Sequence, residues 1–201
     1  MTMDHAALTV QIMAGGQSLR MGRDKAGLAL RGRSLLERAI QRWDGWGHAL
    51  VVAIGGMERA AVVPPGIRAV FDERLGCGPL EGFYRGALAC QTELLLLCAV
   101  DTPFLTPAHA APLCAAIGQA DACVYTIDGR PQPLFGLYRP ARCAAVAQAL
   151  LDSGARKMRL LLDRVDTVTL PAPDPAAFLN INTPQELRAA DARLAQTQTG
   201  G

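Results

Sequence analysis

The chain has 201 residues, of which 50% are hydrophobic, and its formal net charge is +2. This length and apolar content predict one α/β domain with a substantial core rather than two small domains. A nearly neutral charge without a run of basic residues argues against binding to duplex nucleic acid or to a membrane surface, and it favours a small anionic ligand.

Short apolar runs alternate with helix-like stretches over the first two thirds of the chain. Alternation of this kind predicts a mainly parallel sheet with helices on both faces. Ser34 and Glu37 have the spacing of a capping box, which places the start of the first long helix near residue 34. Strands are expected over 7–13, 49–54, 67–71, 94–100 and 122–127, and helices over 34–46, 80–91 and 107–118.

The pattern changes after residue 125. Asp128-Gly129 is a tight-turn signal between 123–127 and the extended stretch 132–138, and it predicts a hairpin. Beyond it we expect helices over 140–152 and 156–164, a strand over 165–170, a proline-rich crossing over 171–175 and a last helix over 183–195. We expect a single domain over residues 1–196, followed by a flexible tail over 197–201.

The cysteines and the apolar segments indicate where the protein works. Six cysteines are present, without a C-x-x-C pair and without a histidine at a zinc-ligand spacing, which predicts buried free thiols. Residues 1–15 lack a basic segment followed by a long apolar core, and the run 94–100 is too short to span a bilayer. We therefore expect a cytoplasmic protein with no membrane partner.

A glycine-rich loop at residues 13–25 (MAGGQSLRMGRDK) follows the first predicted strand. Glycines allow consecutive backbone N–H groups to face phosphate oxygens, and nearby cations neutralise the phosphate charge. The spacing fits neither the Walker loop nor G-x-G-x-x-G, which disfavours Walker ATPases and dinucleotide-binding dehydrogenases. The glycines are Gly15, Gly16 and Gly22, and the cations are Arg20, Arg23 and Lys25.

Lys25 stands out in this loop. It and Lys157 are the two lysines among the twenty basic residues of the chain. A compact ammonium acts on phosphate as a point charge, a use in which arginine is not an equal substitute. We predict that Lys25 binds phosphate, the alternative being an ordinary lysine in a surface loop.

Acidic residues follow two further strands of the predicted sheet. Asp72 follows the strand at 67–71 and Asp101 follows the strand at 94–100. Ligands of open parallel sheets bind at the carboxyl ends of the strands, so both residues belong to the same edge as the glycine-rich loop. Asp101 suits Mg²⁺ that is bound together with phosphate oxygens and waters. The alternative is that Asp101 caps the helix near residue 107, but Thr106 is better placed for that.

Two more segments are candidates for ligand binding. Residues 76–82 (GCGPLEG) form a second glycine-rich turn at the start of a helix, where backbone N–H groups attract anions. Asn180 and Asn182 occupy alternate positions of an extended segment, so both side chains can point to one side. Turn-forming asparagines before a helix are an equally good interpretation.

Together these segments resemble the molybdenum cofactor guanylyltransferase family, whose loop reads approximately LAGGxSxRMGxDK. The resemblance continues through GPLEG at 78–82, DTPFL at 101–105, QPLFGLY at 132–138 and NINTPQEL at 180–187, in order along nearly the whole chain. It implies a three-layer α/β/α nucleotidyltransferase domain of Rossmann-like type. The paired glycines and the asparagine segment favour the guanylyl branch over the cytidylyl branch.

The resemblance also implies roles for individual residues. Lys25 and Asp101 would be catalytic, Lys25 on the phosphates and Asp101 on magnesium, while Asp72 would contact the nucleoside. Met13, Ala14 and Gly15 would line the guanine and ribose side. Gly16, Ser18, Arg20, Gly22 and Gly78 would be further binding residues, and Gly82, Asn180 and Asn182 would face the pterin.

The implied reaction transfers GMP from GTP to the terminal phosphate of molybdenum-loaded molybdopterin and releases pyrophosphate, with Mg²⁺ as cofactor. A transient contact with molybdoenzymes or their chaperones would follow. The alternatives are a cytidylyltransferase on the same acceptor, another nucleotidyltransferase of this fold, and a non-catalytic carrier of finished cofactor. The family often has asparagines after the second strand, where this chain has Ala53-Ile54-Gly55-Gly56, so backbone atoms would have to replace that nucleoside contact.

Overall fold

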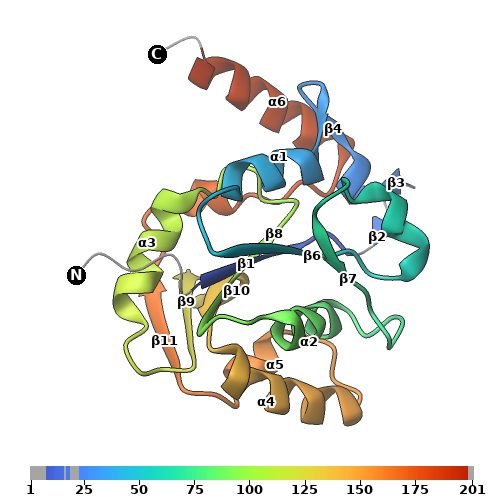
Figure 1. Ribbon diagram of the computed structural model, residues 1–201. Coiled ribbons are helices and arrows are strands. Elements are labelled where there is room, and N and C mark those ends of the chain that lie inside the picture. Colours follow the sequence, from blue (N-terminus) through green and yellow to red (C-terminus); the bar gives the residue numbers. More distant parts are fainter. Residues whose placement is uncertain (1–7, 16, 19–22, 199–201) are drawn as a thin grey trace.

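A seven-stranded sheet forms the centre of the computed structural model, which describes residues 8–15, 17, 18 and 23–198 (Figure 1). The strand order is β11-β9-β10-β8-β1-β6-β7. Strand β10 pairs antiparallel with β8 and β9, whereas the other neighbours pair in parallel, as predicted. The strands are β1 (Leu8–Met13), β6 (Ala49–Ala53), β7 (Arg68–Val70), β8 (Leu94–Ala99), β9 (Ala122–Ile127), β10 (Arg130–Tyr138) and β11 (Thr167–Pro171).

Helices cover both faces of this sheet (Figure 1). One layer contains α1 (Leu35–Trp43), α3 (Pro107–Ala116) and α6 (Pro184–Gln198). The opposite layer contains α2 (Pro79–Ala89), α4 (Pro140–Asp152) and α5 (Arg159–Leu162). The predicted three-layer α/β/α architecture is confirmed.

Several short elements were not expected from the sequence. Two small antiparallel ladders precede α1, and three 3-10 helices of the described residues lie in the connections. None of them has enough residues to produce a hydrophobic period in the sequence. They are β2 (Gln17–Ser18), β3 (Arg23–Asp24), β4 (Ala29–Leu30), β5 (Arg33–Ser34), η2 (Lys25–Gly27), η3 (Met57–Val62) and η4 (Pro175–Phe178).

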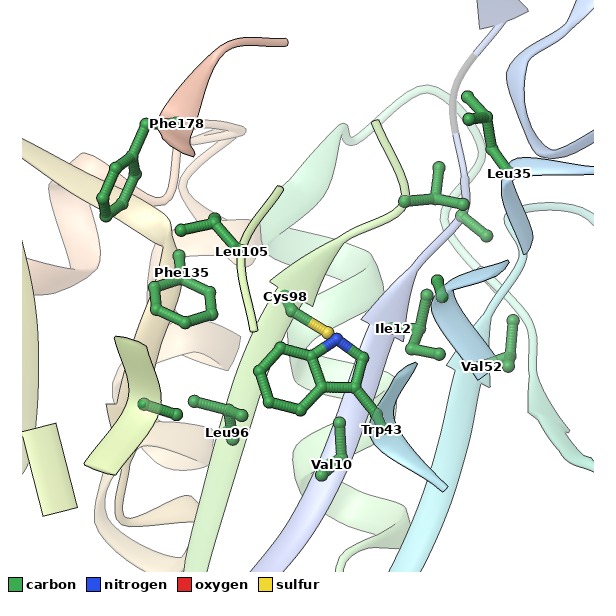
Figure 2. Packing of buried hydrophobic residues seen from close by; sticks show 14 of the residues in the cluster. Val10, Ile12, Leu35, Trp43, Val52, Leu96, Cys98, Leu105, Phe135 and Phe178 are labelled. Carbon is green, nitrogen blue, oxygen red and sulfur yellow. The ribbon is translucent and has the colours of Figure 1, made fainter. Parts of the chain in front are cut away.

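The central strands are apolar on both faces because helices cover both faces. Alternate residues of β1, namely Leu8, Val10 and Ile12, belong to the core beneath α1 and α3. Trp43 is the largest side chain there, with 2% of its surface exposed, and it lies among Val10, Ile12 and Cys98 in Figure 2. Trp43 therefore belongs to the core.

Helix α2 lies unusually close to β1 because two of its residues are glycines. A Cβ atom on Gly86 would lie 2.1 Å from the side-chain amide of Gln11, and a Cβ atom on Gly82 would lie 2.7 Å from Met13 Cε. Gln11 Nε2 donates a hydrogen bond of 2.7 Å to the carbonyl of Gly82, so the buried amide has a partner in the helix. This contact fixes the start of α2 against the strand that leads into the glycine-rich loop.

Capping and turn residues explain most element boundaries. The predicted capping box is present, since Glu37 N–H donates to Ser34 Oγ and Ser34 N–H donates to the Glu37 carboxylate. Helix α1 ends at Trp43 rather than at the predicted residue 46, because Gly45 adopts a φ of +70° that ends the helix. Asp128 and Gly129 both have positive φ, and they form the predicted hairpin turn between β9 and β10.

The remaining differences lie toward the C-terminus. Helix α5 spans four residues instead of the predicted 156–164, and η4 begins at Pro175, the last residue of the predicted crossing. Helix α6 continues to Gln198, beyond the predicted end at 195, and the last three residues of the predicted tail lie outside the described part of the chain.

All six cysteines are free, as predicted, and four of them are buried, whereas Cys77 and Cys90 are half-buried. Over residues 8–15, 17, 18 and 23–198, no helix is both long enough and apolar enough to cross a bilayer.

Candidate active site

The carboxyl ends of β1, β6, β7 and β8 meet at one edge of the sheet, as the sequence predicted. The glycine-rich loop follows β1, Asp72 follows β7 and Asp101 follows β8. Because β1 and β6 lie between β8 and β7, Asp101 and Asp72 are three strand spacings apart, about 14 Å. The edge is therefore an extended site whose two ends carry different residues.

Three side chains from distant parts of the chain meet at the β8 end. Lys25 Nζ donates to Asp101 Oδ2 at 2.7 Å and to Asn182 Oδ1 at 2.6 Å. Lys25 lies at the start of η2, Asp101 beyond β8, and Asn182 just before α6. The side chains of Lys25 and Asp101 are each 18% exposed, so solvent and ligands reach the pair.

Backbone contacts hold these three residues in place. The N–H of Ile181 donates to the carbonyl of Asp101 at 2.9 Å, which fixes the segment before α6 against the end of β8. The carboxylate of Glu186 accepts the N–H groups of Asn182 and Thr183, and these bonds lower the pKa of Glu186. Asn182 is thus held by the first turn of α6 while its side chain reaches Lys25.

The donors at this end suit a magnesium ion. Asp101 supplies a carboxylate and Asn182 an amide oxygen, which are hard oxygen ligands. Magnesium usually keeps several waters and takes one or two carboxylates together with substrate phosphates, so a single aspartate is sufficient. The described residues contain no group of three or more acidic, histidine or cysteine side chains placed to hold a metal without a substrate.

The other end of the edge carries Asp72, whose N–H donates to the carbonyl of Gly55 at 2.7 Å. Burial and, less strongly, the neighbouring carboxylate of Glu81 raise the pKa of Asp72 to about 6, against the opposite effect of Arg85 and Arg59. Asp72 is therefore a carboxylate that gains or loses its proton close to neutral pH.

Glu81 is a buried carboxylate that organises the loop beyond Asp72. Its Oε1 accepts the N–H groups of Glu73 and Arg74 at 3.2 and 3.4 Å, and Arg85 Nε donates to it at 2.6 Å. Its side chain is 0% exposed. A buried charge of this kind is tolerated because it is paired and hydrogen-bonded, and here the pairing fixes the backbone that follows Asp72.

Arg59 spans two turns at the same edge. Its Nη1 donates to the carbonyl of Ile54 at 2.5 Å, and its Nη2 donates to the carbonyl of Ala14 at 3.0 Å. Arg59 and the side chain of Glu81 are not among the predicted site residues. No sequence signal identifies them, because their partners lie up to 45 positions away and are mostly backbone atoms.

The structure describes only some of the predicted binding residues of the glycine-rich loop. Gly16, Arg20 and Gly22 lie outside the described residues, and for Ser18 the backbone alone is described, as part of β2. Gly15 is exposed, while Ala14 is buried, and Met13 is 9% exposed with its side chain against Gly82. Gly15 thus presents backbone to the edge, whereas Met13 and Ala14 pack inward.

The other predicted binding residues, namely Gly78 and the three residues expected to face the pterin, also differ in their placement. Gly78 precedes α2 with a φ of +68°, and a Cβ atom there would lie 3.2 Å from the carbonyl of Arg156. Gly82 is buried and packs under Met13, so the structure gives it a packing role. Asn180 is exposed, and Asn182 contacts Lys25. Contacts of these residues with a pterin stay predictions.

Comparison with known proteins gives a consistent result. The profile of the MobA-like NTP transferase domain matches residues 10–168. The "Probable molybdenum cofactor guanylyltransferase" of Chloroflexus aggregans is 32% identical over 207 residues, covering 96% of this chain and 98% of that protein. The "Molybdenum cofactor guanylyltransferase" of Cereibacter sphaeroides is 33% identical over 187 residues, covering 91% and 95%.

Solved structures share the fold. Molybdopterin-guanine dinucleotide biosynthesis protein A from Archaeoglobus fulgidus superposes with a TM-score of 0.82 at 24% identity, covering 94% of this chain and 99% of that one. The 2-C-methyl-D-erythritol 4-phosphate cytidylyltransferase from Thermus thermophilus gives a TM-score of 0.70 at 20% identity, covering 92% and 98%. Proteins named for different nucleotides and acceptors thus share this architecture, so the fold by itself does not select the substrate.

Proposed function

This chain belongs to the family of MobA-like NTP transferases, and from that premise we propose that it transfers GMP from GTP to molybdenum-loaded molybdopterin, releasing pyrophosphate. The observation that carries the proposal is the meeting of Lys25, Asp101 and Asn182 at the carboxyl end of β8. A cation, a carboxylate and an amide thus meet at the end of a rigid strand. Binding and reaction of a polyphosphate require such groups.

In the proposed reaction an oxygen of the terminal phosphate of molybdopterin attacks the α-phosphorus of GTP. A new P–O bond forms to the α-phosphorus, and the bond from the α-phosphorus to the bridging oxygen breaks, so pyrophosphate leaves with its electron pair. Because the acceptor is already anionic, no protein nucleophile or general base is needed. Catalysis then consists mainly of alignment and of stabilising the negative charge that develops.

Lys25 supplies the positive charge in this scheme. Its ammonium lies beside Asp101 and Asn182, and it would move onto the phosphates of the bound nucleotide, where it stabilises the pyrophosphate leaving group. Asp101 and the amide oxygen of Asn182 would hold Mg²⁺ together with phosphate oxygens. When bound there, the ion would polarise the α-phosphate as a Lewis acid.

The nucleoside would lie toward Asp72, across the ends of β1 and β6. This direction follows from the chemistry of the two ends, since the ammonium of Lys25 lies beside Asp101, whereas Asp72, whose pKa is raised, lies three strand spacings away. Side-chain amides are absent from residues 53–56, and Gly55 and Gly56 are buried, so the base would use the exposed backbone of Gly15 as a hydrogen-bonding surface.

Release of pyrophosphate tests the proposal against a non-catalytic carrier. Purified protein is mixed with GTP, Mg²⁺ and molybdenum-loaded molybdopterin, and pyrophosphate is measured with each component omitted in turn. An enzyme releases pyrophosphate only when GTP and acceptor are both present. A carrier binds both without releasing pyrophosphate, and that result would remove the enzymatic assignment.

We also propose that the protein works in the cytoplasm and passes its product to molybdoenzymes or their chaperones. Six free cysteines support a reducing compartment. Activation of a molybdoenzyme in the same reaction mixture, compared with addition of the separated product, would show whether a direct transfer takes place.

A further inference from the structure

Three turns at the site edge are joined to one another through their backbones. The N–H of Ala14 donates to the carbonyl of Ala53 at 2.8 Å, and the N–H of Asp72 donates to the carbonyl of Gly55 at 2.7 Å. The turn after β6 therefore lies between the turn after β1 and Asp72. Any group that fixes this middle turn also sets the position of the other two.

Arg59 is placed to fix the middle turn, which follows β6. From η3 the guanidinium reaches back along the edge, and its two terminal nitrogens bond the carbonyls of Ile54 and Ala14. One carbonyl belongs to the turn after β6 and the other to the turn after β1. A planar guanidinium can bond two separate acceptors at once with a fixed geometry, which a lysine ammonium on a flexible stem does not reproduce.

The glycines of the two turns leave room for this arrangement. A Cβ atom on Gly15 would lie 3.2 Å from Gly55 N, and a Cβ atom on Gly55 would lie 3.2 Å from Arg59 Nη1. Gly55 also has a φ of +87°, in the region that favours glycine. The turns and the guanidinium are therefore closely fitted, and a side chain on Gly55 would push the guanidinium away.

From these contacts we infer that Arg59 is a positioning residue for the nucleoside end of the site, joining the turn after β1 to the turn after β6. The inference rests on the proposed function, because it takes this end to bind the nucleoside of GTP. Arg59 bonds the backbone of these two turns, so we assign its effect to nucleotide binding and not to the transfer itself. Its charge also favours the ionised form of Asp72, whose N–H is bonded to the same middle turn.

Two substitutions of Arg59 distinguish the effect of the bridge between the two turns from the effect of the positive charge. In Arg59→Ala the bridge and the charge are lost, and in Arg59→Lys the charge is kept while the two-acceptor bridge is lost. We expect both variants to raise the KM for GTP about tenfold, as for loss of hydrogen bonds from a charged group. We expect kcat to stay within about threefold, because the reacting phosphates lie at the other end.

Arg68→Ala is the matched control, since Arg68 is an exposed arginine on the neighbouring strand β7. Arg68→Ala should leave kcat and the KM for GTP unchanged. Equilibrium binding of GTP without acceptor gives a second readout, and the dissociation constant should rise with KM. Thermal unfolding of each variant reports whether the fold is kept, and Arg59→Lys, with a similar stem and the same charge, covers the case in which Arg59→Ala does not fold.

The inference is overturned if Arg59→Lys restores the wild-type KM, if neither variant changes it, or if kcat falls as much as KM rises. If the proposed function itself is wrong, the result is different, because the wild-type protein then binds CTP and not GTP. In that case the same variants are measured with CTP, and the positioning role is tested on that nucleotide.

Discussion

The ammonium of Lys25 lies 2.7 Å from Asp101 Oδ2, so the charge after β1 neutralises the carboxylate after β8. The two residues are 76 positions apart, and the parallel pairing of β1 with β8 brings them together. Both side chains are partly exposed, and Asn182 accepts a second hydrogen bond from the same ammonium. In the proposed function a nucleotide would compete with Asp101 and Asn182 for Lys25, and magnesium would compete with Lys25 for Asp101.

The first prediction concerns Asp101. Asp101→Ala should lower kcat about a hundredfold or more, equivalent to ~3 kcal/mol of transition-state stabilisation, because the variant loses an electrostatic group at the reacting phosphates. Asp44→Ala, which removes an exposed carboxylate at the end of α1, serves as control and should keep wild-type activity. Steady-state GMP transfer measures both. An Asp101→Ala enzyme within threefold of wild type would contradict the assignment.

The second prediction concerns the kind of charge at position 25. Lys25→Arg should lower kcat by at least about tenfold, since a planar guanidinium does not fit where a compact ammonium bonds Asp101 and Asn182 together. The chain offers a matched control in Lys157→Arg, the same substitution at its other lysine, which is exposed. A fully active Lys25→Arg enzyme would show that any positive charge is sufficient.

The third prediction compares the two asparagines before α6. Asn182→Ala should lower kcat about tenfold, because its amide oxygen accepts a charge-assisted hydrogen bond that orients Lys25. Asn180 is exposed, so Asn180→Ala should leave kcat within about threefold and act, if at all, on the KM for molybdopterin. Equal losses of kcat in the two variants would argue against a special role for the contact with Lys25.

The fourth prediction uses the raised pKa of Asp72. Because the pKa is about 6 in the folded protein and 3.8 in the unfolded chain, the folded state binds more protons between these values. The contribution of Asp72 to stability is therefore fully present below pH 3.8, and it is lost as the pH rises through 6. Asp72→Asn removes the buried charge, and it should raise the free energy of unfolding at pH 8 by about 1 kcal/mol, allowing for partial exposure.

Urea denaturation at pH 5 and pH 8 measures the difference in the free energy of unfolding between the wild type and Asp72→Asn. The gain from Asp72→Asn should be smaller at pH 5 than at pH 8, since wild-type Asp72 is mostly protonated at the lower value. Nucleotide binding should show the same pH dependence. The affinity of the wild-type protein for GTP should fall below pH 6, whereas the affinity of Asp72→Asn should not change there. A stabilisation that is equal at the two pH values would mean that Asp72 has an ordinary pKa.

Local signals were sufficient for much of the fold. The Ser34 capping box and the Asp128-Gly129 turn were correctly predicted because their partners are a few residues away in sequence. The apolar strands, each followed by a polar residue, identified the correct edge of the sheet. The end of α1 was misplaced because Trp46 continues the apolar pattern, and the backbone of Gly45 overrides it.

The site was predictable in its residues but not in its contacts. Lys25, Asp101 and Asn182 were recognised individually, but no pattern in the sequence indicated that one ammonium joins all three. Arg59 and Glu81 were not singled out in the sequence because their partners are mostly backbone atoms of other turns. Met13 and Gly82 were expected at the substrate, whereas in the structure they pack against each other, since α2 can approach β1 closely only at glycine.

The most direct test of the account is transfer of labelled α-phosphate from GTP and, in parallel, from CTP onto molybdenum-loaded molybdopterin in the presence of Mg²⁺. We predict that label from GTP enters the product and that label from CTP does not. Transfer from CTP alone would keep the fold and the roles of Lys25 and Asp101 while overturning the guanylyl assignment, and transfer from neither nucleotide would contradict the proposed function.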